Sequence, residues 1–444
     1  MKNAFLFVCA VSVISVFAKP SATITSVVQN WPWDARTKIS YTLVGEAGVR
    51  HDVNIRVKRS FYAPIRGSLR GDVQGVLPGE RCIEWDPSVD GTLADIRRLS
   101  QDDIELEVTA KPITSTTAAS EYLVVDLSEG ANAETWPVSA VDTVDLTDEA
   151  YKTTKILLRK IPASAFMQSS PKDEPLRKST YEVRSEVTLT NDYWIGVYEL
   201  TQKQYELITG VAGTSGQEAY PCKKVKFSDV RGLEAGRYWP KSSDVDADSL
   251  MGKLRAKAVF PSSVPTGWKF DLPTEAQWEH ACRAGTDTAW NNGTGVNVMT
   301  NEAGVVFDPN LDMLGWYAAN SGGKLQKVGL KYPNAFGLYD MHGNVWEMTL
   351  GVIHYDSTPH GGTEPTGKSY HNNDYSLGAG YRVVKGGCYK NDACTYYDDG
   401  LPETAIAMCR SAARCRIYES AYENVGLRIA VRYSLDNEGL DLAE

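Results

Sequence analysis

The sequence predicts two folded regions of different class: an all-β region over residues 19–130 and a larger region with few helices over residues 153–433. In the first region, apolar and polar residues alternate in short runs, which is typical of strands with one buried face. In the second, helices begin with clear capping signals and are separated by loops rich in Gly, Asp and Tyr. A chain of 444 residues accommodates two or three domains.

The chain begins with the layout of a secretory signal peptide over residues 1–18. Lys2 precedes a short apolar stretch that ends at Val16-Phe-Ala18, a suitable cleavage site. The stretch is too short for a membrane span. A lipoprotein processed at Cys9 is disfavoured, because almost no apolar stretch precedes that cysteine. We therefore expect a secreted, periplasmic or cell-surface protein without a membrane span.

Regular strand patterns define the first region. The candidate strands are residues 39–43, 53–57, 104–108 and 122–127. Gly and Asp clusters separate them at intervals that suit a sandwich of immunoglobulin or fibronectin type. Trp31 and Trp33 could form an exposed binding patch, but packing in the core or at an edge is favoured for large aromatics. The polar, acidic residues 131–152 predict a linker, and residues 434–444 an acidic tail.

Three helices are expected in the second region. Thr201 and Gln204 form a capping box for a helix that ends near Gly210. Thr274 opens another helix, which Gly285 stops, and Ser249 opens a third. Within the second helix, Trp278 and Cys282 are four residues apart and share an inward face.

The acidic composition limits the possible partners. The formal net charge is −10, and the sequence contains no cluster of Lys or Arg that would form a basic patch. This opposes binding to nucleic acid or to an anionic membrane. We expect a monomer that binds an unknown protein or glycan.

One segment fits neither a helix nor a strand: Asn334-Ala-Phe-Gly-Leu-Tyr-Asp-Met-His-Gly-Asn-Val-Trp-Glu347. Its glycines permit positive φ, and its aromatic residues, Phe336, Tyr339 and Trp346, can anchor an ordered loop to a core. Asp340 and Glu347, together with main-chain carbonyls, offer the oxygen ligands that Ca²⁺ prefers. Alternatively, these carboxylates only cap turns.

This segment resembles the NxFGLYDMxGNVWEW signature of the formylglycine-generating enzyme (sulfatase-modifying factor) family, with Met348 in place of a second Trp. Further family motifs follow in family order over about residues 155–432. They begin at Ile161 (IPASAF), Tyr193 (YWIGVYELTQ), Leu272 (LPTEAQWEHACRAG), Val384 (VKGG), Cys409 (CRSAAR) and Val425 (VGLRIA).

The resemblance implies an α+β fold of C-type-lectin-like type, with two helices against a small twisted sheet. It also implies a structural Ca²⁺ site formed by the side chains of Asp340 and Glu347 and the carbonyls of Gly343 and Val345. A disulfide between Cys282 and Cys409 is expected from the motifs that hold them. Cys222, Cys388, Cys394 and Cys415 allow three pairings, which stay open.

Active members of the family hold Cu(I) with two cysteine thiolates, and soft thiolates suit that ion. Here the two corresponding positions are Asn391 and Tyr396. The sequence after Gly386-Gly387 resembles instead the non-oxidase branch of the family. Cys388 and Cys394 could form a shifted copper pair, but a disulfide or two buried cysteines is favoured in an exported chain. We therefore expect no catalytic residues.

Other candidate sites are weaker. His354, His360 and His371 lie in one loop and could bind Zn²⁺ or Fe²⁺, although loop histidines are more often solvated. His342 has no expected ligand role. Asp398-Asp399 and residues 418–423 lie where this fold displays a variable binding surface, and solvated loop tips are an equal alternative.

Three functions compete. The leading one is an exported, catalytically silent family member that binds a ligand. The second is a formylglycine-generating oxidase with a shifted cysteine pair. The third is the variable binding protein of a diversity-generating system, which is disfavoured because residues 388–425 contain only Asn391 and Asn424 as asparagines.

Overall fold

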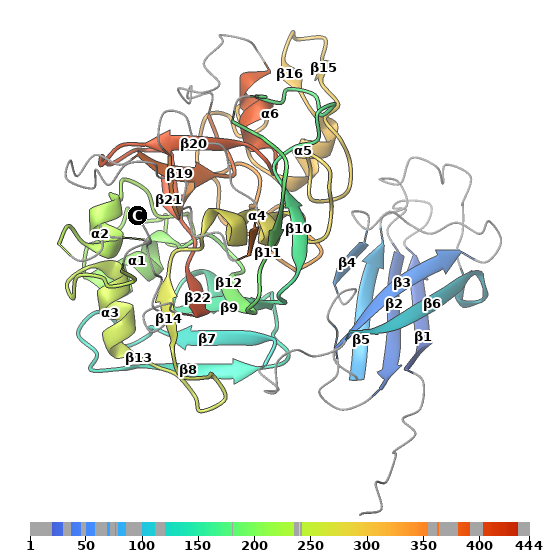
Figure 1. Cartoon of the computed structure of the whole chain (residues 1–444), viewed down its shortest axis with the longest axis horizontal. Helices are drawn as coiled ribbons and strands as arrows, with labels where there is room; N and C mark the ends of the chain where they lie inside the picture. Colours follow the sequence, from blue (N-terminus) through green and yellow to red (C-terminus); the bar gives the residue numbers. More distant parts are fainter. Residues whose placement is uncertain are drawn as a thin grey trace, which may run out of the picture.

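The structure, a computed structural model, shows an N-terminal β region joined to a larger mixed domain (Figure 1). The described residues are 20–29, 37–45, 50–57, 69–71, 76, 79–85, 100–111, 120–179, 181–234, 239, 242–353, 362–363, 381–390 and 403–433.

The N-terminal region contains two antiparallel sheets. A four-stranded sheet has the order β1-β2-β5-β4, and β3 pairs with β6. The strand bounds are β1 (Ser21–Gln29), β2 (Thr37–Val44), β3 (Arg50–Val57), β4 (Leu69–Gly71), β5 (Gly79–Trp85) and β6 (Ile104–Lys111), and a short 3-10 helix spans Gln101–Asp103. The predicted strand β2 is confirmed, and its alternation matches burial: Ile39, Tyr41 and Leu43 are buried between more exposed neighbours. An immunoglobulin or fibronectin type for this region stays a prediction.

The predicted boundary at residue 130 and the predicted linker are wrong. Strands β7 (Tyr122–Asp126) and β8 (Trp136–Val141) pair with each other, and β7 pairs with β9 (Lys155–Ile161) of the mixed domain. Trp136 is fully buried in the core of that domain. The apolar run at residues 122–127 therefore predicted β7 as a strand but could not show which sheet it joins.

The mixed domain is built on two larger sheets. The seven-stranded sheet has the order β13-β8-β7-β9-β12-β22-β14, and a four-stranded sheet has the order β20-β19-β17-β21. Smaller sheets are β10-β11-β18 and β15-β16. The remaining bounds are β10 (Ala165–Gln168), β11 (Ser185–Thr188), β12 (Tyr193–Gly196), β13 (Ala258–Val259), β14 (Trp268–Asp271), β15 (Met299–Thr300), β16 (Val306–Phe307), β17 (Trp346–Ile353), β18 (Gly362–Thr363), β19 (Tyr381–Lys385), β20 (Arg414–Ile417), β21 (Val425–Leu427) and β22 (Ala430–Tyr433).

The three predicted helices are confirmed. They are α1 (Gln202–Thr209), α3 (Leu250–Lys257) and α4 (Glu275–Arg283), and each has the predicted side-chain N-cap. Helix α4 ends at left-handed Ala284, one residue before the predicted stop. Short helices that the sequence did not signal are α2 (Phe227–Arg231), α5 (Pro309–Leu314) and α6 (Thr404–Cys409), and a 3-10 helix spans Glu149–Lys152.

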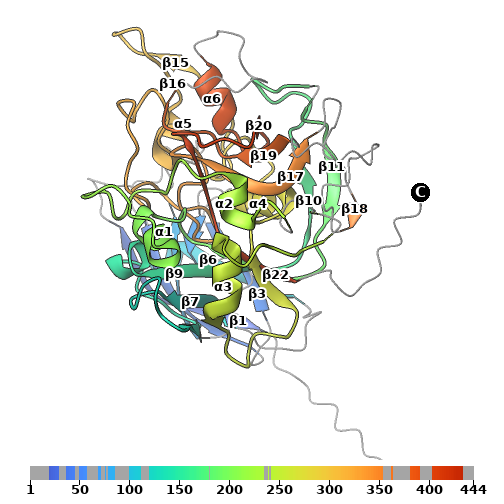
Figure 2. The same ribbon diagram turned by 90° about the vertical axis from the view of Figure 1, so that its left-hand side faces the viewer.

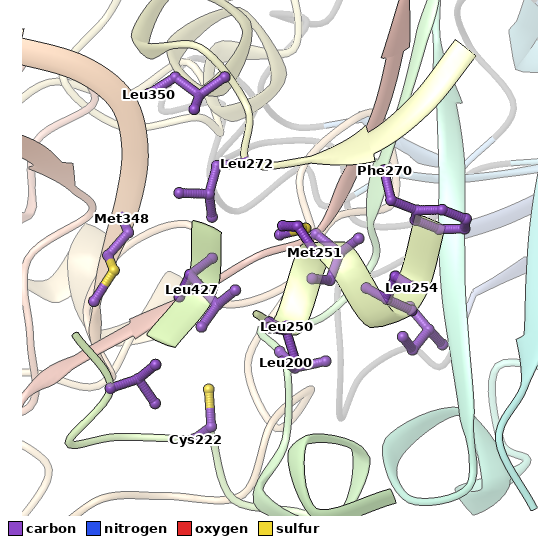
Figure 3. Close-up of a cluster of buried hydrophobic side chains, with 14 of the residues drawn as sticks. Leu200, Cys222, Leu250, Met251, Leu254, Phe270, Leu272, Met348, Leu350 and Leu427 are labelled. Atoms are coloured by element: carbon purple, nitrogen blue, oxygen red, sulfur yellow. The ribbon is translucent and has the colours of Figure 1, made fainter. Parts of the chain in front are cut away.

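Buried residues of α1, α2, α3 and α6 pack with strands of both larger sheets in one core cluster. Figure 2 shows these elements from a second side. Figure 3 shows how Leu250, Met251 and Leu254 of α3 lie beside Phe270 of β14. Leu427 of β21 lies in the same cluster, so secondary-structure elements far apart in the sequence hold each other in place. Across the described residues, no helix has both the length and the apolar character needed to cross a membrane.

Several predicted features lie outside the described residues. They are the signal peptide (1–18), Trp31, Trp33, His354, His360, His371, Asn391, Cys394, Tyr396, Asp398, Asp399 and the acidic tail (434–444).

Candidate functional site

The segment from Asn334 to Glu347, named the signature loop here, is tied to helix α4 at its first residue. The Asn334 side-chain amide donates to the carbonyl oxygens of Ala281 (2.7 Å) and Cys282 (3.0 Å). Its oxygen accepts from the main-chain N–H groups of Phe336 and Leu338. One side chain therefore fixes both the helix end and the start of the loop.

The loop turns through left-handed backbone at Asp340, Gly343 and Asn344, where φ is +56°, +87° and +58°. A Cβ at Gly343 would lie 2.2 Å from the carbonyl oxygen of Trp316, so this position requires glycine. The predicted aromatic anchoring is confirmed for Phe336 and Trp346, which are buried.

Glu347 is fully buried in an ion pair with Arg428. Arg428 Nη2 donates to Glu347 Oε1 (2.8 Å), and Arg428 Nε and Trp278 Nε1 donate to Oε2 (3.0 and 2.7 Å). Arg428 also donates to the carbonyl oxygens of Gly196 and Tyr339. Arg428 Nε also lies 3.2 Å from Oε1, so each Glu347 oxygen accepts two hydrogen bonds from protein donors.

Asp340 is buried and only partly satisfied. Its Oδ2 accepts from the N–H of Gly329 (2.6 Å), whereas its Oδ1 is buried without a hydrogen-bond partner. Burial, reinforced by the charge of Glu347, raises the pKa of Asp340 to about 6, against the opposing effects of Gly329 and Arg428. Burial of a carboxylate oxygen that accepts no hydrogen bond is unfavourable unless a cation binds it or the group is protonated.

A third buried carboxylate, Glu199, meets the loop from the segment between β12 and α1. Its Oε2 accepts from Asn344 Nδ2 (2.7 Å) and its Oε1 from the N–H of Val345 (3.1 Å). Burial, and then the charges of Asp340 and Glu347, raise the pKa of Glu199 well above its ordinary 4.5. Glu199 lies in the YWIGVYELTQ motif, from which no role was predicted for it, although a glutamate three residues after a buried strand is itself a signal.

Together the three carboxylates and Arg428 carry a net charge of −2 when all are ionised. A divalent cation would cancel this charge, and Asp340 Oδ1 is the oxygen of the three carboxylates that accepts no hydrogen bond. Among the described residues, no three His, Cys, Asp or Glu side chains converge to form a metal site by themselves. A metal here must therefore also take main-chain oxygens, as predicted for Gly343 and Val345.

The predicted disulfide between Cys282 and Cys409 is wrong, because both are buried free thiols. Cys282 Sγ lies 3.7 Å from Ser411 Oγ, whereas Cys409 Sγ faces Gly387, where a Cβ would lie 2.5 Å from it. Cys82, Cys222 and Cys388 are also free thiols. Cys415 is disulfide-bonded, and its partner is none of these five.

His342 lies between the two predicted disulfide partners. Its Nδ1 is 2.7 Å from the carbonyl oxygen of Cys409, which can only accept, so Nδ1 carries the proton. Its Nε2 then accepts from the N–H of Asn291 (3.2 Å). Burial lowers the pKa of His342 to about 4, so this histidine is a neutral part of the core.

Cys388, one half of the alternative copper pair, is buried within the mixed domain. Its thiol lies 3.2 Å from the carbonyl oxygen of Lys390, and Asn424 Nδ2 donates to its sulfur at 3.5 Å. The preceding Gly386 and Gly387 have positive φ. The thiol therefore contacts Lys390 in its own turn and Asn424 in the segment that precedes β21.

The candidate binding surface at residues 418–423 is partly engaged in internal contacts. Tyr418 is half exposed, but Glu419 accepts from the N–H of Ser228. Glu423 pairs with Lys223 and Lys224, and hydrogen bonds from both lysines lower the pKa of Glu423 to about 2.

A cleft of about 390 Å³ lies between the N-terminal region and the mixed domain. Lys38 and Cys82 line it on one side, and Glu121, Tyr122 and Arg159 on the other. Arg159 pairs with Glu121 at 2.9 Å and lies over the Tyr122 ring.

The mixed sheets, few helices and long ordered loops define a C-type-lectin-like domain. Residues 159–433 match the family described as Sulfatase-modifying factor enzyme 1-like domain, which is more than half of the chain. The chain therefore belongs to the sulfatase-modifying factor family, and the resemblance read from its motifs is confirmed.

Individual relatives differ in name. The chaperone protein LppX of Paenibacillus barcinonensis is 29% identical over 211 residues, which are 41% of this chain and 69% of that protein. The formylglycine-generating enzyme of Mycobacterium tuberculosis is 35% identical over 123 residues, 26% of this chain and 39% of the enzyme. Among solved structures, Treponema denticola variable protein 1 is 22% identical, with a TM-score of 0.39, covering 63% of this chain and 96% of that one.

Proposed function

We propose that this protein is an exported, calcium-stabilised ligand-binding member of the family, without formylglycine-generating activity. One relative is named a chaperone and another an enzyme, so membership of the family alone leaves both classes open. The ligand is a protein or a glycan.

The observation that carries the proposal is the environment of Cys388. Its buried thiol contacts Lys390 and Asn424, so it is not presented to a substrate. The positions of the family's copper ligands hold Asn391 and Tyr396, an amide and a phenol. Neither is a soft ligand for Cu(I), so the affinity that oxidase chemistry needs is lost.

The test uses the purified protein with Cu(I), oxygen and a Cys-x-Pro-x-Arg peptide, followed by mass spectrometry. No aldehyde is expected. Formation of the aldehyde by the wild type, together with its loss in Cys388→Ser or Cys394→Ser, would establish the oxidase alternative. An active formylglycine-generating enzyme is the positive control for the peptide and the copper.

The calcium part of the proposal rests on the net negative charge of the signature-loop site. Asp340 and Glu347 would hold the ion with their carboxylates, and Gly343 and Val345 with their carbonyl oxygens. Asp340 Oδ1, which is buried without a hydrogen-bond partner, would receive the positive charge that a bound ion supplies.

Calcium binding is checked by elemental analysis and by thermal unfolding with and without EDTA. Binding stabilises the folded state by about 2.7 kcal/mol when free calcium is 100 times its dissociation constant. We expect bound calcium and a lower Tm in EDTA, with Tm restored by excess calcium. An unchanged Tm and no bound calcium would exclude the site.

A further inference from the structure

We propose that Ser164 and His280 form a nucleophile–base pair that cleaves an ester with a small acyl group. This activity is separate from the ligand binding proposed above and does not depend on it. Ser164 lies in the short connection between β9 and β10, and His280 lies on α4. Ser164 Oγ is 2.7 Å from His280 Nε2, which is the distance expected between a nucleophile and its base.

The tautomer of His280 follows from the contact of its other ring nitrogen. The Tyr193 hydroxyl donates to the carbonyl oxygen of Gln277 (2.7 Å), which can only accept. The Tyr193 oxygen, 3.1 Å from His280 Nδ1, therefore accepts the Nδ1–H. In the neutral ring Nε2 then carries no proton, so it accepts the hydroxyl proton of Ser164. Tyr193 is thus the positioning residue that orients the base.

Main-chain contacts hold Ser164 beside the imidazole. The N–H of Ala163 donates to Asp192 Oδ1 (2.8 Å), and the Ser164 carbonyl oxygen accepts from the N–H of Leu189 (3.1 Å). Lys160 pairs with the other oxygen of Asp192 at 3.0 Å. The connection is therefore fixed on both sides of the serine, which keeps its hydroxyl near the base before a substrate binds.

The base is shielded from water, whereas the nucleophile is accessible. His280 is buried, and the ring centroids of Phe166 and Phe336 lie 5.1 and 5.9 Å from that of the imidazole. Ser164 is half-buried, and the adjacent Ala165 is exposed. Apolar rings beside a small, exposed neighbour favour an uncharged ester whose acyl group is small.

The reaction has two steps. Ser164 Oγ attacks the carbonyl carbon of the ester while its proton passes to His280 Nε2. The bond between the carbonyl carbon and the alcohol oxygen then breaks, and Nε2 returns the proton to that oxygen, which leaves acyl-Ser164 and a free alcohol. In the second step water loses a proton to Nε2 and attacks the acyl group. This step restores the serine and releases the carboxylic acid.

The test uses the full chain with p-nitrophenyl acetate and, separately, with a fluorophosphonate probe whose position is mapped by peptide mass spectrometry. We expect the phosphonyl group on Ser164 and release of p-nitrophenol above the rate without protein. Ser164→Ala should abolish both. His280→Gln should lower both rates at least about 100-fold, the lower end of what a general base contributes.

Two further variants separate catalysis from packing. Ser185→Ala is the matched control and should keep wild-type rates. Ser185 lies on the neighbouring strand β11, and its buried hydroxyl has no hydrogen-bond partner among the described residues. Tyr193→Phe should lower kcat and leave KM unchanged, because the phenol contacts the base and not the ester.

Near-UV circular dichroism confirms the fold of each variant. A wild-type protein with neither label nor turnover would overturn the proposal. So would a label on another residue together with turnover that persists in Ser164→Ala. If His280→Gln does not fold, Ser164→Ala and the mapped position of the label decide the question.

Discussion

Two buried ion clusters in the mixed domain have opposite composition. In the signature-loop cluster, Arg428 is paired with Glu347, and the charges of Glu199 and Asp340 act on the same guanidinium. In the second, here named the arginine cluster, Arg231, Arg255 and Arg432 all bond the single carboxylate of Asp271. Each cluster carries two excess charges when ionised, but they differ in how the excess is relieved.

The arginine cluster relieves its excess with protein groups. Arg255 Nε donates to the carbonyl oxygen of Phe270 (2.8 Å), and Arg231 and Arg255 both donate to that of Ser243. Arg432 also lies 4.2 Å from the Trp239 ring. Carbonyls are abundant in a fold, so buried guanidinium groups find acceptors. A buried carboxylate must instead find a donor, a proton or a cation, and this difference distinguishes the two clusters.

The largest expected effect is at the single guanidinium of the carboxylate cluster. Arg428→Met would leave three carboxylates together and remove donors from the carbonyl oxygens of Gly196 and Tyr339. Removing one partner of a buried ion pair costs about 3–5 kcal/mol. We expect at least this loss in urea unfolding without calcium, and a partial recovery with calcium. Equal losses in both conditions would contradict a cation site.

Asp271→Asn tests the corresponding position in the arginine cluster. The three guanidinium groups would lose their shared anion, and we expect a loss of about 3–5 kcal/mol in the same assay. Calcium should not change the size of this loss in the free energy of unfolding. The surface variant Asp145→Asn controls for the chemistry of the substitution and should remain near wild-type stability.

The pH dependence of stability gives a third comparison. Burial raises the pKa of Asp271, but Arg231, Arg432 and Arg255 outweigh it, so its pKa lies below the ordinary 3.8. The unfolded chain then binds the proton first, and stability present at neutral pH is lost as pH falls below about 4. Urea unfolding between pH 5 and pH 3 should show this loss in the wild type. The contribution of Asp271 should disappear in Asp271→Asn.

The smallest effect is expected at Arg255. Its side chain is 16% exposed, and two other guanidinium groups remain on Asp271 when it is replaced. Arg255→Met should therefore cost no more than about 1 kcal/mol, near the value for partly exposed pairs. A loss as large as that of Arg428→Met would mean that excess charge of either sign is equally hard to bury.

Local signals in the sequence were sufficient for several elements. The N-caps of α1, α3 and α4 depend on residues within one turn, and all three were predicted correctly. The glycines and aromatic residues of the signature loop were likewise sufficient to predict that this segment forms an ordered loop.

Features that depend on distant partners were not predictable in the same way. The apolar run at residues 122–127 identified β7 but did not show its domain, because sheet membership depends on pairing with β9. The direction of a thiol cannot be read from a motif, so Cys282 and Cys409 were paired although His342 lies between them. Glu199 was missed because its partners at positions 344 and 345 are far along the chain.

The signature loop also determines how the chain leaves the core at the Gly386-Gly387 turn. Gly343 donates to the carbonyl oxygen of Gly386 (2.7 Å), and Tyr389 donates to that of Asn344 (2.8 Å). The two segments are thus joined on both sides of Cys388, and Ser321 Oγ adds a bond to the Tyr389 carbonyl oxygen. For protein engineering, this makes Tyr389 a fixed point of attachment, because its N–H and its carbonyl oxygen are both bonded to the framework.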